Sequence, residues 1–293
     1  MHALVIHNPT AGTGNHTAEA LSAFLQDLGY AVTACSTKQG LYKKCLNEHA
    51  DLILVAGGDG AITRVIRSLP NFNVPLAILP LGTANNIARS LGLEGEADVL
   101  LDCIRKRITR KLDVGLVSGG PWKNRRFVEG VGLGLLANWM YGASSKPPAP
   151  ERTQKGRELL REALGKAVPR QWTLNIDGHE LSQEFLLVEI LNTRFIGPAL
   201  PIGPSSEPGD RLLDVVYLLP EARSEMLAWL ENPHRTASPL LVRQGRKIIL
   251  NWEHGPLHID DRSWERPDSN AKVTMKLAAE GLHVCAPVPH KEK

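Results

Sequence analysis

Apolar runs alternate with amphipathic segments through the first hundred residues. Four runs, ALVIHNP, AVTACS, DLILVAGG and VPLAILP, predict strands. The segments at about 16–28, 41–49, 61–69 and 85–91 predict the helices that follow them. A strand covered on both faces is apolar throughout, whereas a half-exposed strand alternates. The pattern therefore predicts a parallel sheet with helices on both faces.

The pattern changes after about residue 110. Strands are predicted by nine short runs: KLDVGLVS, RRFVEGVG, QWTLNIDG, EFLLVEILN, LLDVVYLL, KIILNW, PLHID, AKVTMKL and LHVCAP. Helix-like stretches are fewer, chiefly 154–167 and 221–231. Successive strands joined by turns favour a mainly antiparallel β-sandwich. We therefore expect two domains, an α/β domain over 1–110 and a β-rich domain over 111–293.

Composition agrees with a globular protein. The 293 residues are 43% hydrophobic and 22% charged, and no apolar run reaches the roughly 18 residues that a membrane span needs. The start, MHALVIHNPT, lacks the basic segment of a signal peptide. We expect a cytoplasmic protein. The net charge is only +3, yet residues 101–170 alone carry +9. This basic middle favours an anionic partner (phosphate, an acidic membrane or nucleic acid), and a solvated surface of mixed charge is the alternative.

Cysteines and histidines predict no metal site. Cys35, Cys45, Cys103 and Cys285 form no CxxC pair, so reduced thiols are expected. His254 and His258 are four apart, but a Gly-Pro pair lies between them. No helix can therefore aim both rings at one metal ion.

Three glycine-rich loops follow strands of the predicted parallel sheet. They are NPTAGTG (8–14), GGDGA (57–61) and PLGTANN (80–86). Such loops lie at the carboxyl ends of parallel strands, where open sheets bind ligands, and glycine lets backbone amides approach an anion. Together they predict a polyphosphate site, although no Walker A motif occurs. Asp59 would repel phosphate unless a cation lay between them. It therefore indicates Mg²⁺ with a nucleotide, or else a helix N-cap.

These motifs resemble the diacylglycerol kinase catalytic-domain superfamily, which includes bacterial lipid kinases and sphingosine and ceramide kinases and is distantly similar to NAD kinases. The resemblance rests on NPTAG, GGDGA and PLGTANNIARSLGL. It extends to EILNTRFIGPALPIGPSSEPGDRLLDVVYL (189–218) and to LHIDD near the end. It implies an NAD kinase/diacylglycerol kinase-like α/β domain, a β-sandwich domain and the use of ATP and Mg²⁺ to phosphorylate a lipid hydroxyl.

The family's functional residues transfer by position. The resemblance implies that a nucleotide site is formed by Asn8, Pro9, Thr10, Ala11, Gly12, Thr37, Gly57, Gly58, Asp59, Gly60, Ala61, Ile62, Thr63 and Thr83. It also implies that Asp210 binds a structural Mg²⁺, together with the main-chain carbonyls of Glu207 and Leu212. An ordinary turn aspartate before a strand is the alternative for Asp210.

Four positions depart from the family pattern. Ala61 replaces a threonine, Arg64 a glutamate and Asn86 an aspartate, and Arg262 stands where the family places a catalytic glutamate in a DGE motif. A kinase that acts on an alcohol uses a carboxylate to accept the hydroxyl proton, and arginine cannot do so. The candidates for that role are Asp260, Asp261 and Glu265 near the C-terminus, and Asp59 elsewhere in the chain. A catalytically impaired nucleotide- or lipid-binding homologue is the competing hypothesis. An NAD kinase is disfavoured by the segment at 210–216.

The acceptor is expected to be a lipid met at a membrane surface, either diacylglycerol-like or sphingosine-like. VGLGLLANWMYGA (131–143) could form an apolar wall, and the basic stretch 152–170 could contact anionic lipid. The alternative is that Leu135, Leu136, Trp139 and Met140 belong to the core at helical spacing. We expect no nucleic-acid partner. The oligomeric state is open, with a dimer as one option.

Overall fold

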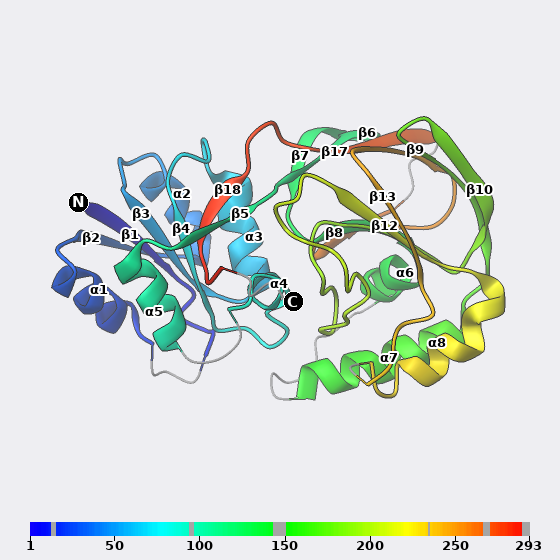
Figure 1. Cartoon of the computed structure of the whole chain (residues 1–293), viewed down its shortest axis with the longest axis horizontal. Coiled ribbons are helices and arrows are strands. Elements are labelled where there is room, and N and C mark those ends of the chain that lie inside the picture. Colours follow the sequence, from blue (N-terminus) through cyan, green and yellow to red (C-terminus); the bar gives the residue numbers. More distant parts are fainter. Residues whose placement is uncertain (13–15, 94–96, 143–150, 234, 266–269, 289–293) are drawn as a thin grey trace. The chain divides into compact units, whose positions relative to one another are not determined.

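The computed structural model describes residues 1–293 except 13–15, 94–96, 143–150, 234, 266–269 and 289–293. The chain divides into two compact units (Figure 1). Unit 1 comprises Met1–Asp113 and Glu280–Lys293, and unit 2 comprises Val114–Ala279. Among the described residues, no helix is both long enough and apolar enough to cross a membrane.

Unit 1 is a six-stranded sheet with helices. Its strands are β1 (His2–His7), β2 (Ala31–Ser36), β3 (Leu52–Gly57), β4 (Leu76–Pro80), β5 (Thr109–Leu112) and β18 (Leu282–Cys285). Its helices are α1 (Ala18–Asp27), η1 (Lys38–Gly40), α2 (Tyr42–Cys45), α3 (Asp59–Ser68), α4 (Asn86–Ser90) and α5 (Ala97–Lys106). The strand order is β2-β1-β3-β4-β18-β5. All pairs are parallel except β18 with β5, which is antiparallel.

The sequence explains why this sheet is buried. Every residue of β3 is buried, and so are the four central residues of β1, as expected for strands covered on both faces. Helix α3 places Ile62, Val65 and Ile66 on one buried face at helical spacing. The edge strand β2 has no fully buried residue. The parallel sheet predicted from the apolar runs is confirmed.

Unit 2 contains two antiparallel sheets and a helical layer. Its strands are β6 (Gly115–Gly119), β7 (Trp122–Phe127), β8 (Gly130–Gly134), β9 (Arg170–Ile176), β10 (His179–Phe185), β11 (Leu187–Leu191), β12 (Leu213–Leu218), β13 (Leu241–Gly245), β14 (Lys247–Trp252), β15 (Leu257–Ile259), β16 (Arg262–Trp264) and β17 (Ala271–Leu277). Its helices are α6 (Leu135–Gly142), α7 (Arg152–Lys166), η3 (Pro220–Ala222) and α8 (Arg223–Trp229). The strand orders are β10-β9-β14-β17-β6-β7 and β13-β12-β11-β8-β15-β16.

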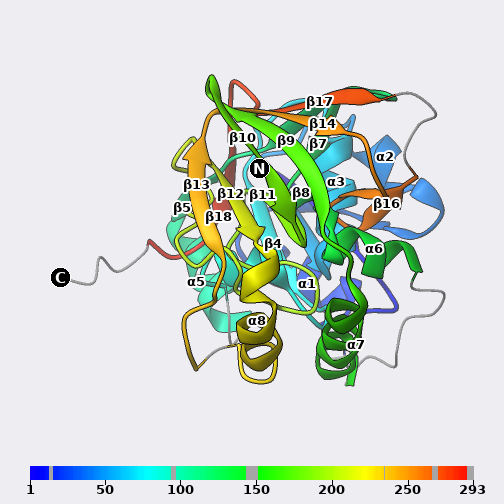
Figure 2. The ribbon, with the colours of Figure 1, turned by 90° about the vertical axis from the view of Figure 1, so that its right-hand side faces the viewer.

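Two apolar cores hold unit 2 together. One lies between the sheets and includes Trp172, Phe185 and Trp252. The other joins the second sheet to α6, α7 and α8, which lie along its outer face (Figure 2). Leu135 and Leu136 belong to this second core, as the core alternative expects for these two side chains. The predicted β-sandwich is confirmed.

The end of the chain differs from the predicted domain division. The sequence assigned 111–293 to the second domain, and LHVCAP to a strand in it. In the structure that segment forms β18, which pairs with β4 and β5 in the sheet of unit 1 (Figure 1). Val284 and Cys285 are buried there. An apolar strand carries no information about which sheet it joins, and this is why the sequence misplaced it.

Candidate nucleotide site and the Asp260 turn

Four parallel strands of unit 1 end at one edge of the sheet. β1 ends at His7, β2 at Ser36, β3 at Gly57 and β4 at Pro80. In the sheet, β2 lies on one side of β1, and β3 and β4 lie on the other, so the direction of strand addition reverses at β1. The carboxyl edge at such a reversal is the usual ligand site of open α/β sheets.

Backbone hydrogen bonds join the loops at this edge. Asn8 N donates to Ala56 O at 2.9 Å, and Thr37 N donates to His7 O at 3.0 Å. Leu81 N donates to Gly57 O at 3.0 Å. The segments that carry the predicted contacts Asn8–Gly12, Thr37, Gly57–Thr63 and Thr83 therefore lie along one edge. Residues 13 and 14 of the first loop lie outside the described residues.

The second and third glycine loops touch through their backbones. An ideal Cβ added to Gly58 would lie 2.9 Å from Gly82 Cα, and one added to Gly82 would lie 2.6 Å from Gly58 Cα. Gly58 has φ −89° and ψ 179°, so glycine is needed here for space and not for an unusual backbone conformation. Any side chain at either position would separate the loops.

Asn85 shapes the loop after β4. Its Oδ1 accepts from Gly82 N at 2.9 Å, and its Nδ2 donates to Gly82 O at 3.0 Å. Asn85 adopts φ 51° and ψ 42°, directly before α4, a left-handed conformation that asparagine tolerates. Thr83 is held inside this closed turn and is partly exposed.

Asp59 links two helix N-termini. It is the first residue of α3, whose N-cap is Gly58, and its Oδ1 accepts from Ile87 N in the first turn of α4 at 3.0 Å. Burial raises the pKa of Asp59, while the amides of α4 oppose that rise. Asp59 thus accepts a hydrogen bond at a helix N-terminus, as the capping alternative expects, but the helix is α4 and not α3, to which Asp59 belongs.

The remaining predicted nucleotide residues differ in exposure. Ala61, Ile62 and Thr63 are buried in α3, and the amides of Ala61 and Ile62 already donate to Gly58 O at 2.8 and 3.2 Å. Asn8 Oδ1 accepts from Thr10 N at 3.3 Å and from Thr10 Oγ1 at 3.0 Å, which shapes the loop after β1. Gly12 has φ 80°, and Pro9 and Thr10 are exposed.

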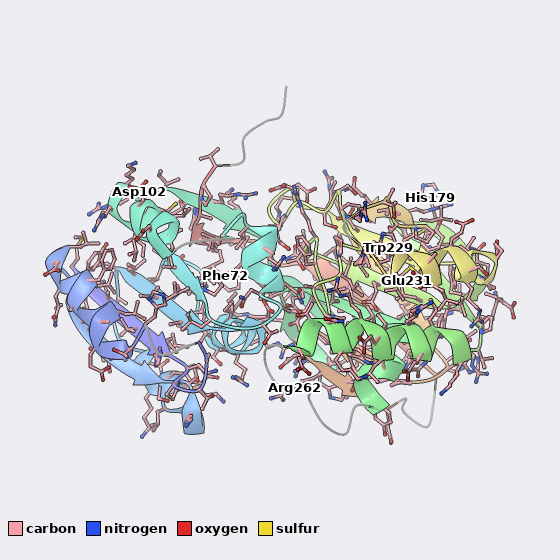
Figure 3. All side chains as sticks on the ribbon, turned by 90° about the horizontal axis from the view of Figure 1, so that it is seen from below. Phe72, Asp102, His179, Trp229, Glu231 and Arg262 are labelled. Atoms are coloured by element: carbon pink, nitrogen blue, oxygen red, sulfur yellow. A yellow bond between two sulfur atoms is a disulfide. The ribbon has the colours of Figure 1, made fainter. Side chains whose placement is uncertain are left out.

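The predicted carboxylates near the C-terminus have different environments. Asp260 is 1% exposed, and its carboxylate accepts from the amides of Val128 at 3.0 Å, Glu129 at 2.8 Å and Gly130 at 3.2 Å. These contacts give Asp260 a structural task. Asp261 and Arg262 follow it at the start of β16 and are exposed; Arg262 is labelled in Figure 3.

The predicted Mg²⁺ residues form a tight turn before β12. Asp210 is exposed, and its Oδ1 accepts from Leu212 N at 2.9 Å. Glu207 O accepts from the amides of Gly209 and Asp210. One carboxylate beside backbone carbonyls fits the oxygen preference of Mg²⁺. Among the described residues no group of three His, Cys, Asp or Glu side chains could hold a metal ion.

Sequence reasoning missed a disulfide beside this site. Cys35, at the end of β2, is bonded to Cys45 in α2, which corrects the expectation of four reduced thiols. The bond closes the segment that contains Thr37. A ten-residue separation without a CxxC motif gives no geometric signal in the sequence. Cys103 and Cys285 are free thiols, as predicted, and both are buried.

A buried pair in unit 2 was also missed. Glu189 and His258 are each fully buried, and His258 Nε2 lies 2.8 Å from Glu189 Oε2. Burial raises the pKa of Glu189. Burial alone would lower the pKa of His258, but Glu189 and the carbonyl of Asp260 outweigh it and raise that pKa. The two residues are 69 apart in sequence, so only strand pairing reveals them.

The two units have the fold that diacylglycerol kinases and NAD kinases share. The architecture is similar to that of a diacylglycerol kinase crystal structure from Bacillus anthracis, with a TM-score of 0.74, 20% identity and coverage of 98% of this chain and 97% of that one. It is less similar to an NAD kinase from Archaeoglobus fulgidus in complex with ATP, at a TM-score of 0.53 and 15% identity over 97% of this chain and 93% of that one.

Family comparisons are more specific. The diacylglycerol kinase catalytic domain matches residues 2–117, and the YegS C-terminal NAD kinase beta sandwich-like domain matches 156–247. The chain is 31% identical to a diacylglycerol kinase of Bacillus subtilis over 232 residues, which is 74% of this chain and 73% of that protein. It is 27% identical to one of Mycobacterium tuberculosis over 185 residues, 60% of this chain and 58% of that protein. The chain belongs to the diacylglycerol kinase family, a family of lipid kinases.

Proposed function

We propose that this protein transfers the γ-phosphoryl group of ATP to the hydroxyl of a diacylglycerol-like or sphingosine-like lipid. In this step the bond from the γ-phosphorus to the bridging oxygen breaks, a bond to the lipid oxygen forms, and the hydroxyl proton leaves to a base. The observation that carries the proposal is the backbone contact of Gly58 with Gly82 at the carboxyl edge of a parallel sheet in a lipid kinase family.

The nucleotide contacts would come mainly from backbone amides. Several amides of the two loops Asn8–Gly12 and Gly57–Thr63 already donate within unit 1. The remaining amides, those in the first turn of α3 above all, are suited to phosphate because they lie at a helix N-terminus. Thr37 and Thr83 are partly exposed at the same edge and would contact the remainder of the nucleotide. Asp59 would serve this site by holding the first turn of α4 beside the start of α3, through the hydrogen bond that its carboxylate accepts from the α4 amide.

The residues suited to Mg²⁺ are Asp210 and the carbonyls of Glu207 and Leu212. A bound Mg²⁺ would supply structural order and charge to this loop. The hydroxyl proton needs a carboxylate. Because Asp260 is engaged with three amides, the exposed Asp261 is the better candidate for the base.

A second candidate function is a binding protein that has lost efficient catalysis. Two observations favour it: Arg262 occupies the position expected for the glutamate, and Asp260 is fully engaged by backbone. Phosphoryl transfer depends more on positioning and charge neutralisation than on a strong base, which favours the kinase.

One experiment separates the two candidates. Radiolabelled ATP with Mg²⁺ is incubated with vesicles that contain diacylglycerol, sphingosine or neither, and the phosphorylated lipid is measured. The variant Asp261→Gly/Arg262→Glu restores the family sequence, and Asp261→Asn removes the candidate base. General-base catalysis contributes about 10²–10⁴-fold. If the wild-type protein has high lipid kinase activity and the Asp261→Asn variant loses it, the kinase is supported, with Asp261 as the base.

The other outcomes decide differently. A silent wild-type protein that binds ATP and gains activity only in the double variant identifies the impaired homologue. If wild type and both variants phosphorylate none of the lipids and bind neither ATP nor the lipid vesicles, both candidate functions are rejected. Titration calorimetry of ATP with Gly58→Val, which would place a branched side chain against the phosphate contact, tests the loop assignment separately.

A further inference from the structure

Three adjacent strands of unit 2 place a glutamate, a glycine and a histidine in one row. Glu189 on β11 lies opposite Gly132 on β8, and Gly132 lies opposite His258 on β15. A Cβ at Gly132 would overlap the carboxyl group of Glu189. The glycine therefore leaves the space through which Glu189 crosses the middle strand to reach His258.

The imidazole of His258 connects this carboxylate to a turn. Nε2 lies 2.8 Å from Glu189 Oε2 and 3.1 Å from Oε1, and Nδ1 lies 3.2 Å from the backbone oxygen of Asp260. A carbonyl can only accept, so Nδ1 carries a hydrogen. One further proton is shared between Nε2 and Glu189, which makes the pair neutral as a whole wherever that proton resides.

The turn that receives this hydrogen bond is itself closely held. Asp260 has φ 51°, and its carboxylate accepts from three successive amides, those of Val128, Glu129 and Gly130. Asn192 joins the same segment, because its Nδ2 donates to Val128 O at 2.9 Å. The hydrogen bonds thus lead from the buried pair to Asp260, the residue directly before the exposed Asp261 and Arg262.

A merely stabilising role does not account for the pair. Replacing a buried ionic pair by apolar residues of similar size is often neutral or stabilising, and the residues two before and two after Glu189, on the same face of β11, belong to the apolar core that contacts the helices. What an apolar pair could not supply is the donor to the Asp260 carbonyl. We propose that Glu189 and His258 are a positioning pair that fixes the turn at Asp260 and so places Asp261 and Arg262 for phosphoryl transfer. This inference rests on the proposed kinase function.

Two variants and the wild-type protein test it. Glu189→Leu/His258→Leu fills the same space and removes the donor to Asp260. Glu189→Gln keeps it, because a neutral amide can donate to Nε2 while Nδ1 retains its hydrogen. Two readouts are compared: hydrogen exchange of the amides of Val128, Glu129 and Gly130, and steady-state kinetics with ATP and a lipid acceptor. Thermal unfolding shows whether each variant folds.

The expected result is selective. In the double-leucine variant, exchange at 128–130 rises at least about tenfold at unchanged melting temperature. Its kcat falls about 10- to 100-fold while KM for ATP changes less than about twofold, since small displacements of reacting groups cost up to about 10² in rate. Glu189→Gln stays within about threefold of wild type in both readouts.

Several results would overturn the inference. Unchanged exchange at 128–130 would show that the pair does not hold the turn. Faster exchange with unchanged kcat would leave the pair a structural role only. If the double variant does not fold, histidine-selective NMR of the wild-type protein decides, because ring N–H protons of a buried imidazole exchange slowly enough to be observed. If Nδ1 of His258 carries no hydrogen at neutral pH, it cannot donate to Asp260, and the positioning role of the pair is rejected. Hydrogen exchange of the amides at 128–130 does not depend on activity. An inactive wild-type protein would therefore contradict the proposed function, while the effect of the positioning pair on the turn could still be tested.

Discussion

Changing Gly58 to alanine tests the contact between the two glycine loops. The new Cβ would lie 2.9 Å from Gly82 Cα, a backbone atom that cannot rotate away. Overpacking of this kind costs about 1–3 kcal/mol. The φ of −89° suits alanine, so the lower entropy of the unfolded chain returns about 0.4–1 kcal/mol. The net destabilisation is about 0–2.6 kcal/mol, or up to about 10 °C in Tm at roughly 2–4 °C per kcal/mol.

The assay combines thermal unfolding with titration calorimetry of ATP and Mg²⁺. Because separated loops would misplace their amides, the Kd for ATP should rise at least about tenfold, about 1.4 kcal/mol. Gly165→Ala in α7 is the matched control, since a Cβ there meets nothing within 4 Å and a helix favours alanine over glycine. It should leave ATP binding unchanged and keep or raise Tm.

A double variant sharpens the test. Gly82→Ala would push its Cβ to 2.6 Å from Gly58 Cα, so both substitutions force the same separation. Their costs should therefore be non-additive by at least about 0.5 kcal/mol. A Gly58→Ala protein with the Tm and the ATP affinity of wild type would refute the reasoning, as would strictly additive losses in the double variant.

Three further outcomes are expected. Reducing the Cys35–Cys45 bond, which closes a ten-residue separation, should lower the free energy of unfolding by about 2–3 kcal/mol; equal urea midpoints with and without reductant would contradict this. Burial and the nearby Cys103 raise the pKa of the Cys285 thiol to about 11. The rate of its labelling by maleimide at pH 8 should therefore be at least about 10²-fold lower than that of an ordinary thiol. The rate should rise about tenfold per pH unit toward pH 10. Labelling as fast as that of glutathione would contradict the raised pKa. Finally, if the basic stretch 152–170 contacts anionic lipid, vesicle binding should weaken with salt by about 1 kcal/mol per basic residue engaged; binding indifferent to salt and lipid charge leaves only a solvated surface.

Local sequence patterns predicted the elements better than their partners. The apolar run of β3 is buried on both faces, and the glycine loops follow their strands at one edge. Both results depend on short-range features that a single chain displays. The motifs also identified the family correctly.

Long-range features could not be predicted in the same way. Asp260 was a candidate base because the sequence does not show which groups contact a carboxylate in the fold. In the structure its carboxylate accepts hydrogen bonds from three amides of the segment at 128–130. The Glu189–His258 pair depends on the register of β11, β8 and β15. The disulfide depends on how β2 and α2 pack. Each joins residues whose proximity only the folded chain creates.

The position of β18 has a consequence for synthesis of the chain on the ribosome. Residues 282–285 lie between β4 and β5, so the sheet of unit 1 stays incomplete until all of unit 2 has been translated. Unit 2, by contrast, is one continuous segment. At about 5–20 residues per second, the wait between β5 and β18 is on the order of ten seconds. During that time β4 and β5 present unpaired edges, which are sites for aggregation. The strands that carry the phosphate loops are made first, but their sheet is completed last.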